Sequence, residues 1–216
     1  MPSAPEARTF AADLPFKFVG GDAAIDLVNT VDWTANGLVD DRLTNYERLI
    51  EWASGAELVT PRLGQALMMG RARPKGARQA LAKAVALRWT LRRLFVAIAH
   101  GEPIPPDALA ELNAAVTRAM VRLELAPVRG PSTGTLRWSW AEAGEHLDSM
   151  LWPVARSAAD LLASDDATRI RECGAADCGW QYVDRSRNGL RRWCQMAVCG
   201  TREKSRRRAE RNAAAG

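Results

Sequence analysis

The chain has 216 residues, of which 25% are charged and 47% hydrophobic, and its formal net charge is +5. This length suits one domain with a small appendage, and it is enough to bury a core. Since no apolar run approaches the roughly 20 residues that span a bilayer, we expect no membrane partner.

The first part of the chain is predicted to form helices. Residues 1–13, rich in Ala, Pro and Glu, are expected to be a poorly ordered start. A capping-box pattern that begins at Thr44 predicts a helix through about residue 56. A second helix is expected to begin at Thr60, with Pro61 in its first turn, and to end before residue 73.

The strongest periodicity of the chain follows. Apolar residues recur at helical spacing from about 79 to 99, interrupted only at Arg88, and the same spacing returns over 107–120. Residues 121–125 and 135–140 alternate with period two around a Gly- and Pro-rich turn, which predicts a β-hairpin.

A last helix of the body is expected over about 145–163, with Pro153 as a candidate kink. Trp138 and Trp140 share one face of a predicted strand, and we expect them to pack against neighbouring helices. The alternative is an open cleft or a dimer contact. The predicted body is therefore mainly helical with a small antiparallel sheet.

Asp26, Asn29 and Thr30 form the main polar cluster of an otherwise apolar segment. Because positions i and i+3 share a helical face, Asp26 and Asn29 are candidates for a small-molecule pocket. The simpler reading is a helix terminus that satisfies its own backbone. There is no P-loop pattern, and His100 and His146 are each solitary, so we expect a protein without enzymatic activity.

Four cysteines form two C-x4-C pairs near the end of the chain: Cys173, Cys178, Cys194 and Cys199. Four thiolates are a usual tetrahedral ligand set for structural zinc, Zn²⁺, and leave no position for a catalytic water. Disulfides, free buried thiols and an iron–sulfur cluster are the alternatives. The chain does not begin with a secretory pattern, so we expect a reducing cytoplasm, which favours zinc over disulfides.

Around the cysteines, residues 180–183 and 190–193 are predicted to be short strands joined by a turn that contains Asn188-Gly189. Residues 201–212 lack Gly and Pro and are predicted to form a helix, which gives a treble-clef-like arrangement. Glu203 is expected to pair with Arg207, four positions later.

Positive charge is concentrated in this segment. Residues 169–216 hold twelve Lys and Arg against five Asp and Glu, whereas residues 1–168 hold eighteen against twenty. A solvated helix is the ordinary meaning of such a run, but its attachment to a metal module favours a nucleic-acid partner. The candidate contact residues are Arg191, Arg192, Arg202, Lys204, Arg206, Arg208 and Arg211.

The residues also resemble a known family. Residues 184–186 (Asp-Arg-Ser), 191–193 (Arg-Arg-Trp) and 194–202 (Cys-Gln-Met-Ala-Val-Cys-Gly-Thr-Arg) resemble the CGNR zinc finger, with Thr201 where the family name has Asn. Further upstream, Phe-Val-Gly-Gly at 18–21 and Ile-Asp-Leu-Val-Asn-Thr at 25–30 resemble the ABATE domain, which precedes this finger in bacterial proteins described as stress-induced transcription regulators.

The resemblance implies an ABATE-like body at 14–168 and a CGNR-like finger at 169–212. It also implies a transcription regulator of the stress response, in which zinc orders a finger that binds DNA and the body senses a small molecule or forms a homodimer. The alternatives are a small-molecule enzyme with a structural zinc module and a module that binds RNA or an acidic protein.

Overall fold

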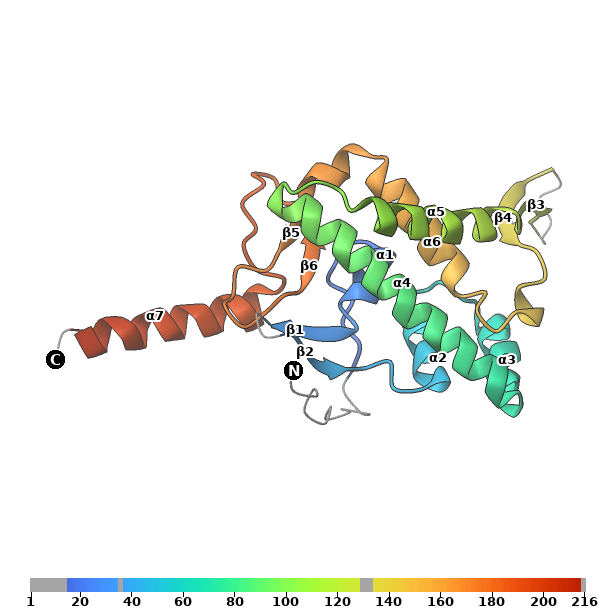
Figure 1. Cartoon of the computed structure of the whole chain (residues 1–216), viewed down its shortest axis with the longest axis horizontal. Coiled ribbons are helices and arrows are strands. Elements are labelled where there is room, and N and C mark those ends of the chain that lie inside the picture. Colours follow the sequence, from blue (N-terminus) through green and yellow to red (C-terminus); the bar gives the residue numbers. More distant parts are fainter. Residues whose placement is uncertain (1–14, 35–36, 129–133, 215–216) are drawn as a thin grey trace.

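A computed structural model describes residues 15–34, 37–128 and 134–214. A helical body occupies most of the molecule, and the last helix projects away from it (Figure 1). The predicted poorly ordered start at 1–13 lies outside the described residues. Among the described helices, none is long and apolar enough to cross a membrane.

The chain forms α-helices and short antiparallel strand pairs, as the predicted α+β class requires. The α-helices are α1 (Ala23–Val28), α2 (Tyr46–Gly55), α3 (Pro61–Met69), α4 (Pro74–His100), α5 (Pro106–Met120), α6 (Leu151–Leu162) and α7 (Thr201–Ala214). The paired strands are β1 (Val31–Thr34) with β2 (Gly37–Asp41), β3 (Leu123–Pro127) with β4 (Leu136–Trp140), and β5 (Ile170–Glu172) with β6 (Gln181–Val183).

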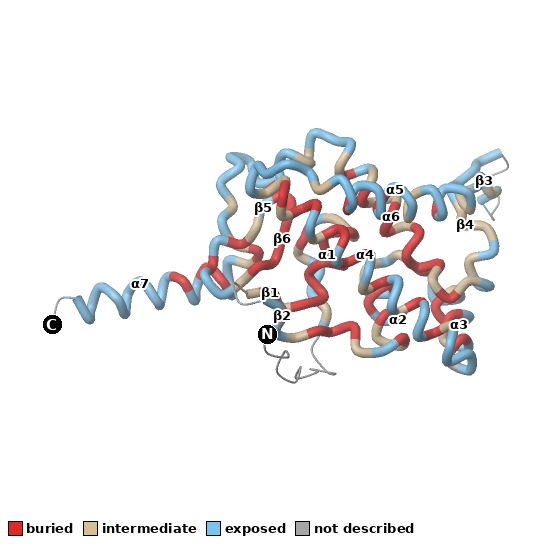
Figure 2. The backbone as a smooth tube through the Cα atoms, viewed as in Figure 1, coloured by how far each residue is buried: buried red, intermediate tan, exposed pale blue. Residues whose placement is uncertain are grey.

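The long helix α4 is the centre of the body. Pro74 occupies its first turn, and Gly101 ends it in the left-handed conformation (φ 68°) that glycine adopts without strain. Helices α1, α2 and α5 and strand β5 pack against it. The buried residues accordingly follow the interior-facing sides of these elements (Figure 2).

Arg88, which interrupts the apolar stripe of α4, is fully buried in an ion pair. Its guanidinium donates to both carboxylate oxygens of Asp41, at 2.7 and 2.6 Å, and to the hydroxyl of Thr30 at 3.1 Å. A buried charge is tolerated only when it is paired and hydrogen-bonded, so α4 remains a core helix despite this residue.

Several details differ from the sequence-based predictions. Asn45, not Thr44, caps α2, because its side chain accepts the backbone N–H of Arg48. Helix α6 begins at Leu151, so Pro153 lies in its first turn and does not kink the helix as predicted. Trp138 is 56% exposed rather than buried against helices, although the guanidinium of Arg156 in α6 lies 5.3 Å from its ring centroid.

The β3–β4 hairpin is present as predicted, with Leu123 opposite Trp140 and Leu125 opposite Trp138. Trp140 is half-buried, with its ring centroid 6.1 Å from that of Trp152 in α6. The β1–β2 hairpin was not anticipated, although Gly37 at φ 105° follows an Asn in the sequence, and Asn-Gly is a common hairpin turn.

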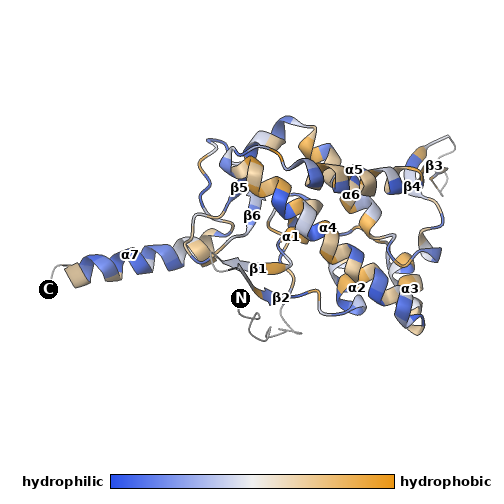
Figure 3. Cartoon of the chain, in the orientation of Figure 1, coloured by the Kyte–Doolittle hydropathy of each residue, from blue (hydrophilic) through white to orange (hydrophobic). Residues whose placement is uncertain are grey.

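The C-terminal segment shares the core of the body. Trp180, Tyr182 and Val183 belong to the same buried cluster as α1 and α4. Helix α7 is the exception, since it is hydrophilic along most of its length (Figure 3) and exposed apart from Glu203.

Candidate metal centre and nucleic-acid interface

The four cysteines converge on one point. Their Sγ atoms all lie within 4.8 Å of one another. Cys194 Sγ lies 3.8 Å from Cys178 Sγ and 3.6 Å from Cys199 Sγ, and all four cysteines are free thiols rather than disulfides.

These sulfurs fit a zinc ion. Zn–S bonds of about 2.3 Å in a tetrahedron give sulfur–sulfur edges of about 3.8 Å. Two N–H groups also point at the cluster, from the backbone of Cys194 to Cys173 Sγ (3.4 Å) and from the Arg202 guanidinium to Cys199 Sγ (3.7 Å). Such donors stabilise thiolate charge around a metal. The four cysteines would hold zinc as a structural ion that ties the two knuckles together.

The thiols cannot all ionise by themselves. Hydrogen bonds from Cys178 and Cys194 lower the pKa of Cys173, while hydrogen bonds with Cys173 and Cys178 raise the pKa of Cys194. Hydrogen bonding to Cys173 also raises the pKa of Cys178. Four thiolates at these distances therefore require a compensating cation.

The first pair of cysteines lies in the loop of the β5–β6 hairpin, whose hydrogen bonds include Cys173 N to Trp180 O at 2.8 Å. The ribbon predicted between residues 180–183 and 190–193 is wrong. Strand β6 pairs with β5, while Leu190 is 75% exposed and residues 190–193 are irregular.

In the loop after β6, side chains form hydrogen bonds with the backbone groups, and no neighbouring strand does so in the described part of the chain. The buried Asp184 accepts the backbone N–H groups of Ser186 (2.9 Å) and Arg191 (3.0 Å), together with the Ser186 hydroxyl. The Tyr182 hydroxyl donates to Arg191 O at 2.6 Å. The Asp-x-Ser motif therefore fixes the conformation of this loop through hydrogen bonds between side chains and backbone.

The second pair of cysteines leads directly into α7. A Cβ at Gly200 would lie 2.5 Å from Met196 Sδ and 2.8 Å from Trp193 Cδ1, so any other residue there would have to displace these side chains. Trp193 thus packs over the knuckle. The Thr201 hydroxyl donates to Met196 O at 3.3 Å.

Two contacts fix the start of α7 on the first knuckle. The Glu203 carboxylate accepts the backbone N–H of Ala176 at 3.3 Å, and Arg202 forms an ion pair with Asp177 at 2.7 Å. Hydrogen bonding from Arg206 lowers the pKa of Glu203.

The predicted pair of Glu203 with Arg207 is replaced by another. Arg206 binds Glu203 (2.7 Å) and Glu210 (2.6 Å), so Arg206 lies between two carboxylates. Arg207 is left without an ion-pair partner in the described part of the chain. It is a candidate contact residue that the sequence reasoning missed, and the i,i+3 spacing of Glu203 and Arg206 was the available signal.

Four cations form one stripe along α7: Lys204, Arg207, Arg208 and Arg211. They stand at i, i+3, i+4 and i+7 and are exposed, and none has an ion pair among the described residues. At 100° per residue, Arg202 and Arg206 lie on the opposite side of the helix. The free charge therefore faces away from the ion-paired side of α7.

The two arginines of the preceding loop differ from each other. Arg191 donates to the carbonyls of Trp193, Cys194 and Val19, and it lies 4.1 Å from the centroid of the Tyr182 ring. This engagement makes it a structural residue. Arg192 is exposed, with its guanidinium 5.3 Å from the Trp193 ring centroid, and stays available to a ligand.

The side chains of the polar cluster, Asp26, Asn29 and Thr30, form hydrogen bonds with other parts of the protein. Asp26 accepts the N–H of Gly20 at 2.8 Å, and burial raises the pKa of Asp26 to about 6. The Asn29 amide binds both backbone groups of Gln181, and the Thr30 hydroxyl donates to Leu27 O at 2.7 Å. Each of these side chains therefore has a hydrogen-bond partner within the protein.

Comparison with known families agrees with this geometry. The ABATE family model, described as "Putative stress-induced transcription regulator", matches residues 21–165, which is more than half of the chain, and the CGNR zinc finger model matches residues 169–212. No curated protein matched the chain. The chain belongs to the ABATE family and ends in a CGNR zinc finger.

Proposed function

We propose that this protein is a zinc-dependent DNA-binding transcription regulator of the cytoplasm, in which α7 contacts the duplex. The stripe of Lys204, Arg207, Arg208 and Arg211 carries the proposal. It is a row of cations that form no ion pair among the described residues, on a helix whose first turn is held by the cysteine knuckles. Cations in such a row bind phosphates, and release of DNA counterions supplies the affinity.

The body is proposed to sense a small molecule or to form a homodimer, in response to stress, without catalysis. One local pattern could suggest an enzyme, because residues 130–134 read G-x-S-x-G. In the sequence that pattern stands between β3 and β4, two strands that pair with each other, whereas a nucleophile elbow joins a strand to a helix; residues 130–133 lie outside the described residues.

The test is fluorescence anisotropy of the zinc-loaded protein with random duplex DNA over a salt series. The triple variant K204Q/R208Q/R211Q removes three predicted phosphate contacts, so the slope of log K against log salt should become shallower by about 3. The control R62Q/K75Q/R78Q removes one Lys and two Arg from α3 and α4, at the far end of the body from α7 (Figure 1), and should leave the slope unchanged.

Zinc-stripped protein should lose salt-sensitive binding. Equal slopes for the two triple variants would place the DNA surface elsewhere, and preference for single-stranded RNA over duplex DNA would refute the proposal in favour of an RNA-binding module.

A further inference from the structure

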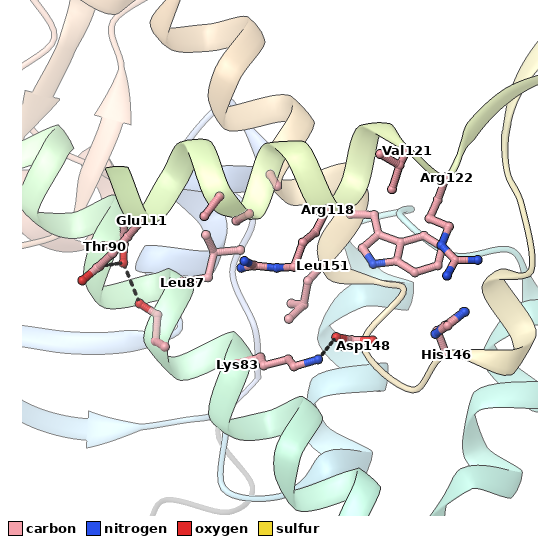
Figure 4. Close-up of a pocket in the computed structure, with 15 residues that line it drawn as sticks. Lys83, Leu87, Thr90, Glu111, Arg118, Val121, Arg122, His146, Asp148 and Leu151 are labelled. Carbon is pink, nitrogen blue, oxygen red and sulfur yellow. Dashed lines mark hydrogen bonds and ion pairs between the residues drawn. The ribbon is translucent and has the colours of Figure 1, made fainter. Parts of the chain in front are cut away.

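A cavity of about 540 Å³ opens between α4, α5 and the start of α6 (Figure 4). Its volume lies within the range of small-molecule sites, about 300–1,000 Å³. None of the residues that line it belongs to the zinc finger. It is therefore separate from the metal centre and from the basic stripe of α7.

The inner wall of the cavity is apolar. Leu87 of α4 and Leu151, Trp152 and Ala155 of α6 contribute to it. The indole of Trp152 is held in place from behind, since it belongs to a buried cluster with Ala155 and contacts the Trp140 ring. A rigid, flat wall of this kind suits an aromatic or cyclic apolar group.

Most charges around the cavity are already matched within the protein. Lys83 and Asp148 form an ion pair at 2.5 Å, which Figure 4 shows at one edge of the cavity. Arg122 pairs with Glu142. These four groups have little charge left for a ligand.

The remaining charged groups are Glu111 and Arg118, on the same face of α5. Glu111 accepts the hydroxyl of Thr90 at 2.6 Å and so has a hydrogen-bond donor. Arg118 has no ion-pair partner among the described residues, and its side chain lies across the cavity between Leu87 and Leu151 (Figure 4). His146 lies at the rim, with its ring 5.4 Å from that of Trp152.

We propose that this cavity binds a small organic anion, with an aromatic or cyclic apolar body and one carboxylate. The apolar body would lie against Trp152 and Leu151. The carboxylate would accept both N–H groups of one edge of the Arg118 guanidinium, a geometry that arginine forms with carboxylates in two parallel hydrogen bonds. Glu111 also lacks an ion-pair partner among the described residues, but it lies beside Thr90, whereas Arg118 lies between Leu87 and Leu151 (Figure 4). The guanidinium is therefore the charge next to the apolar wall, which favours an anion there over a cation.

As a binding site, this cavity does not depend on DNA binding. Its role as the effector site rests on the proposed function, so ligand binding is measured first in the absence of DNA. The probes are benzoate, 1-naphthoate and indole-3-acetate, titrated into the full-length zinc-loaded protein by calorimetry, with 1-naphthylmethanol and 1-naphthylmethylamine as neutral and cationic counterparts.

At least one carboxylate should bind, and the alcohol and the amine should bind at least about tenfold more weakly than 1-naphthoate, because a charged hydrogen-bonded pair is lost. Arg118→Gln should weaken the carboxylate by a similar factor. The matched control is Arg137→Gln, at an exposed position on β4 that does not line the cavity, and this change should leave carboxylate binding unaltered. Tighter binding of the amine, equal binding of the alcohol, or no binding by any carboxylate at millimolar concentration would overturn the proposal.

A second pair of variants tests the location. Ala114→Phe fills the cavity from an exposed position of α5 and should abolish binding, while Ala110→Phe, one turn earlier and outside the lining, should retain it. Equal affinity in both variants would place the ligand elsewhere. If a carboxylate binds here but leaves DNA affinity unchanged, the effector role is refuted, and the proposal that the cavity binds carboxylates stands.

Discussion

The Asn29 amide joins the body to the zinc finger, and its removal tests whether the two form one folding unit. Its Nδ2 donates to Gln181 O at 2.8 Å, and its Oδ1 accepts Gln181 N–H at 2.9 Å. Asn29 is 2% exposed and Gln181 fully buried. In Asn29→Ala both backbone groups of Gln181 lose their partners where water does not reach them.

An unsatisfied buried polar group costs about 1–3 kcal/mol, so the two together should lower the free energy of unfolding by about 2–6 kcal/mol. That is a large share of the roughly 5–15 kcal/mol of an ordinary domain. The assay is urea unfolding of the zinc-loaded protein. Asn113→Ala, at an exposed position of α5, is the control and should change stability by less than about 0.5 kcal/mol. An equally small loss in Asn29→Ala would refute the reasoning, as would separate unfolding of body and finger.

Two further predictions concern the finger itself. Cys194→Ser should reduce zinc content and the helicity of α7 together, as measured by metal analysis and circular dichroism; a variant with full zinc content would contradict the ligand set. Arg207→Gln should make the salt dependence of DNA binding shallower by about 1, whereas Arg206→Gln should not, because Arg206 already pairs with Glu203 and Glu210. A larger change from Arg206→Gln would reverse the assignment of free and paired faces.

The helices could be predicted because their signals are local. Amphipathic spacing located α4 and α5 to within a few residues, and Thr60 with Pro61 marked the start of α3, where the structure shows the Thr60 side chain as the cap. The cysteine site was predictable for a similar reason, since the spacing of ligands in each knuckle is itself a sequence pattern.

Pairings between distant segments were not predictable in this way. Residues 190–193 were predicted to be a strand that pairs with residues 180–183, but β6 pairs with β5, and the Asn29 amide binds β6 from 152 positions away. Arg118 gave no signal in the sequence, because an exposed arginine on an amphipathic helix becomes distinctive only when neighbouring elements enclose a cavity around it. Tertiary context decides both cases.

Different parts of the finger are held in different ways, some by contacts with the body and some by the metal site. The body holds the first knuckle directly, since Gly179 N–H donates to Trp33 O (2.9 Å) and Arg92 to Gly179 O (2.7 Å).

Strand β6 is also held by the body. The Trp180 indole donates to Val31 O at 2.9 Å and Val183 N–H to Gly20 O at 2.8 Å.

Helix α7 has few such attachments, and those near its start reach the knuckles rather than the body. Loss of zinc should therefore release the second knuckle and α7 while β5 and β6 stay docked. The metal would then control the orientation of the basic stripe of α7, and the body would supply the rigid base from which it projects.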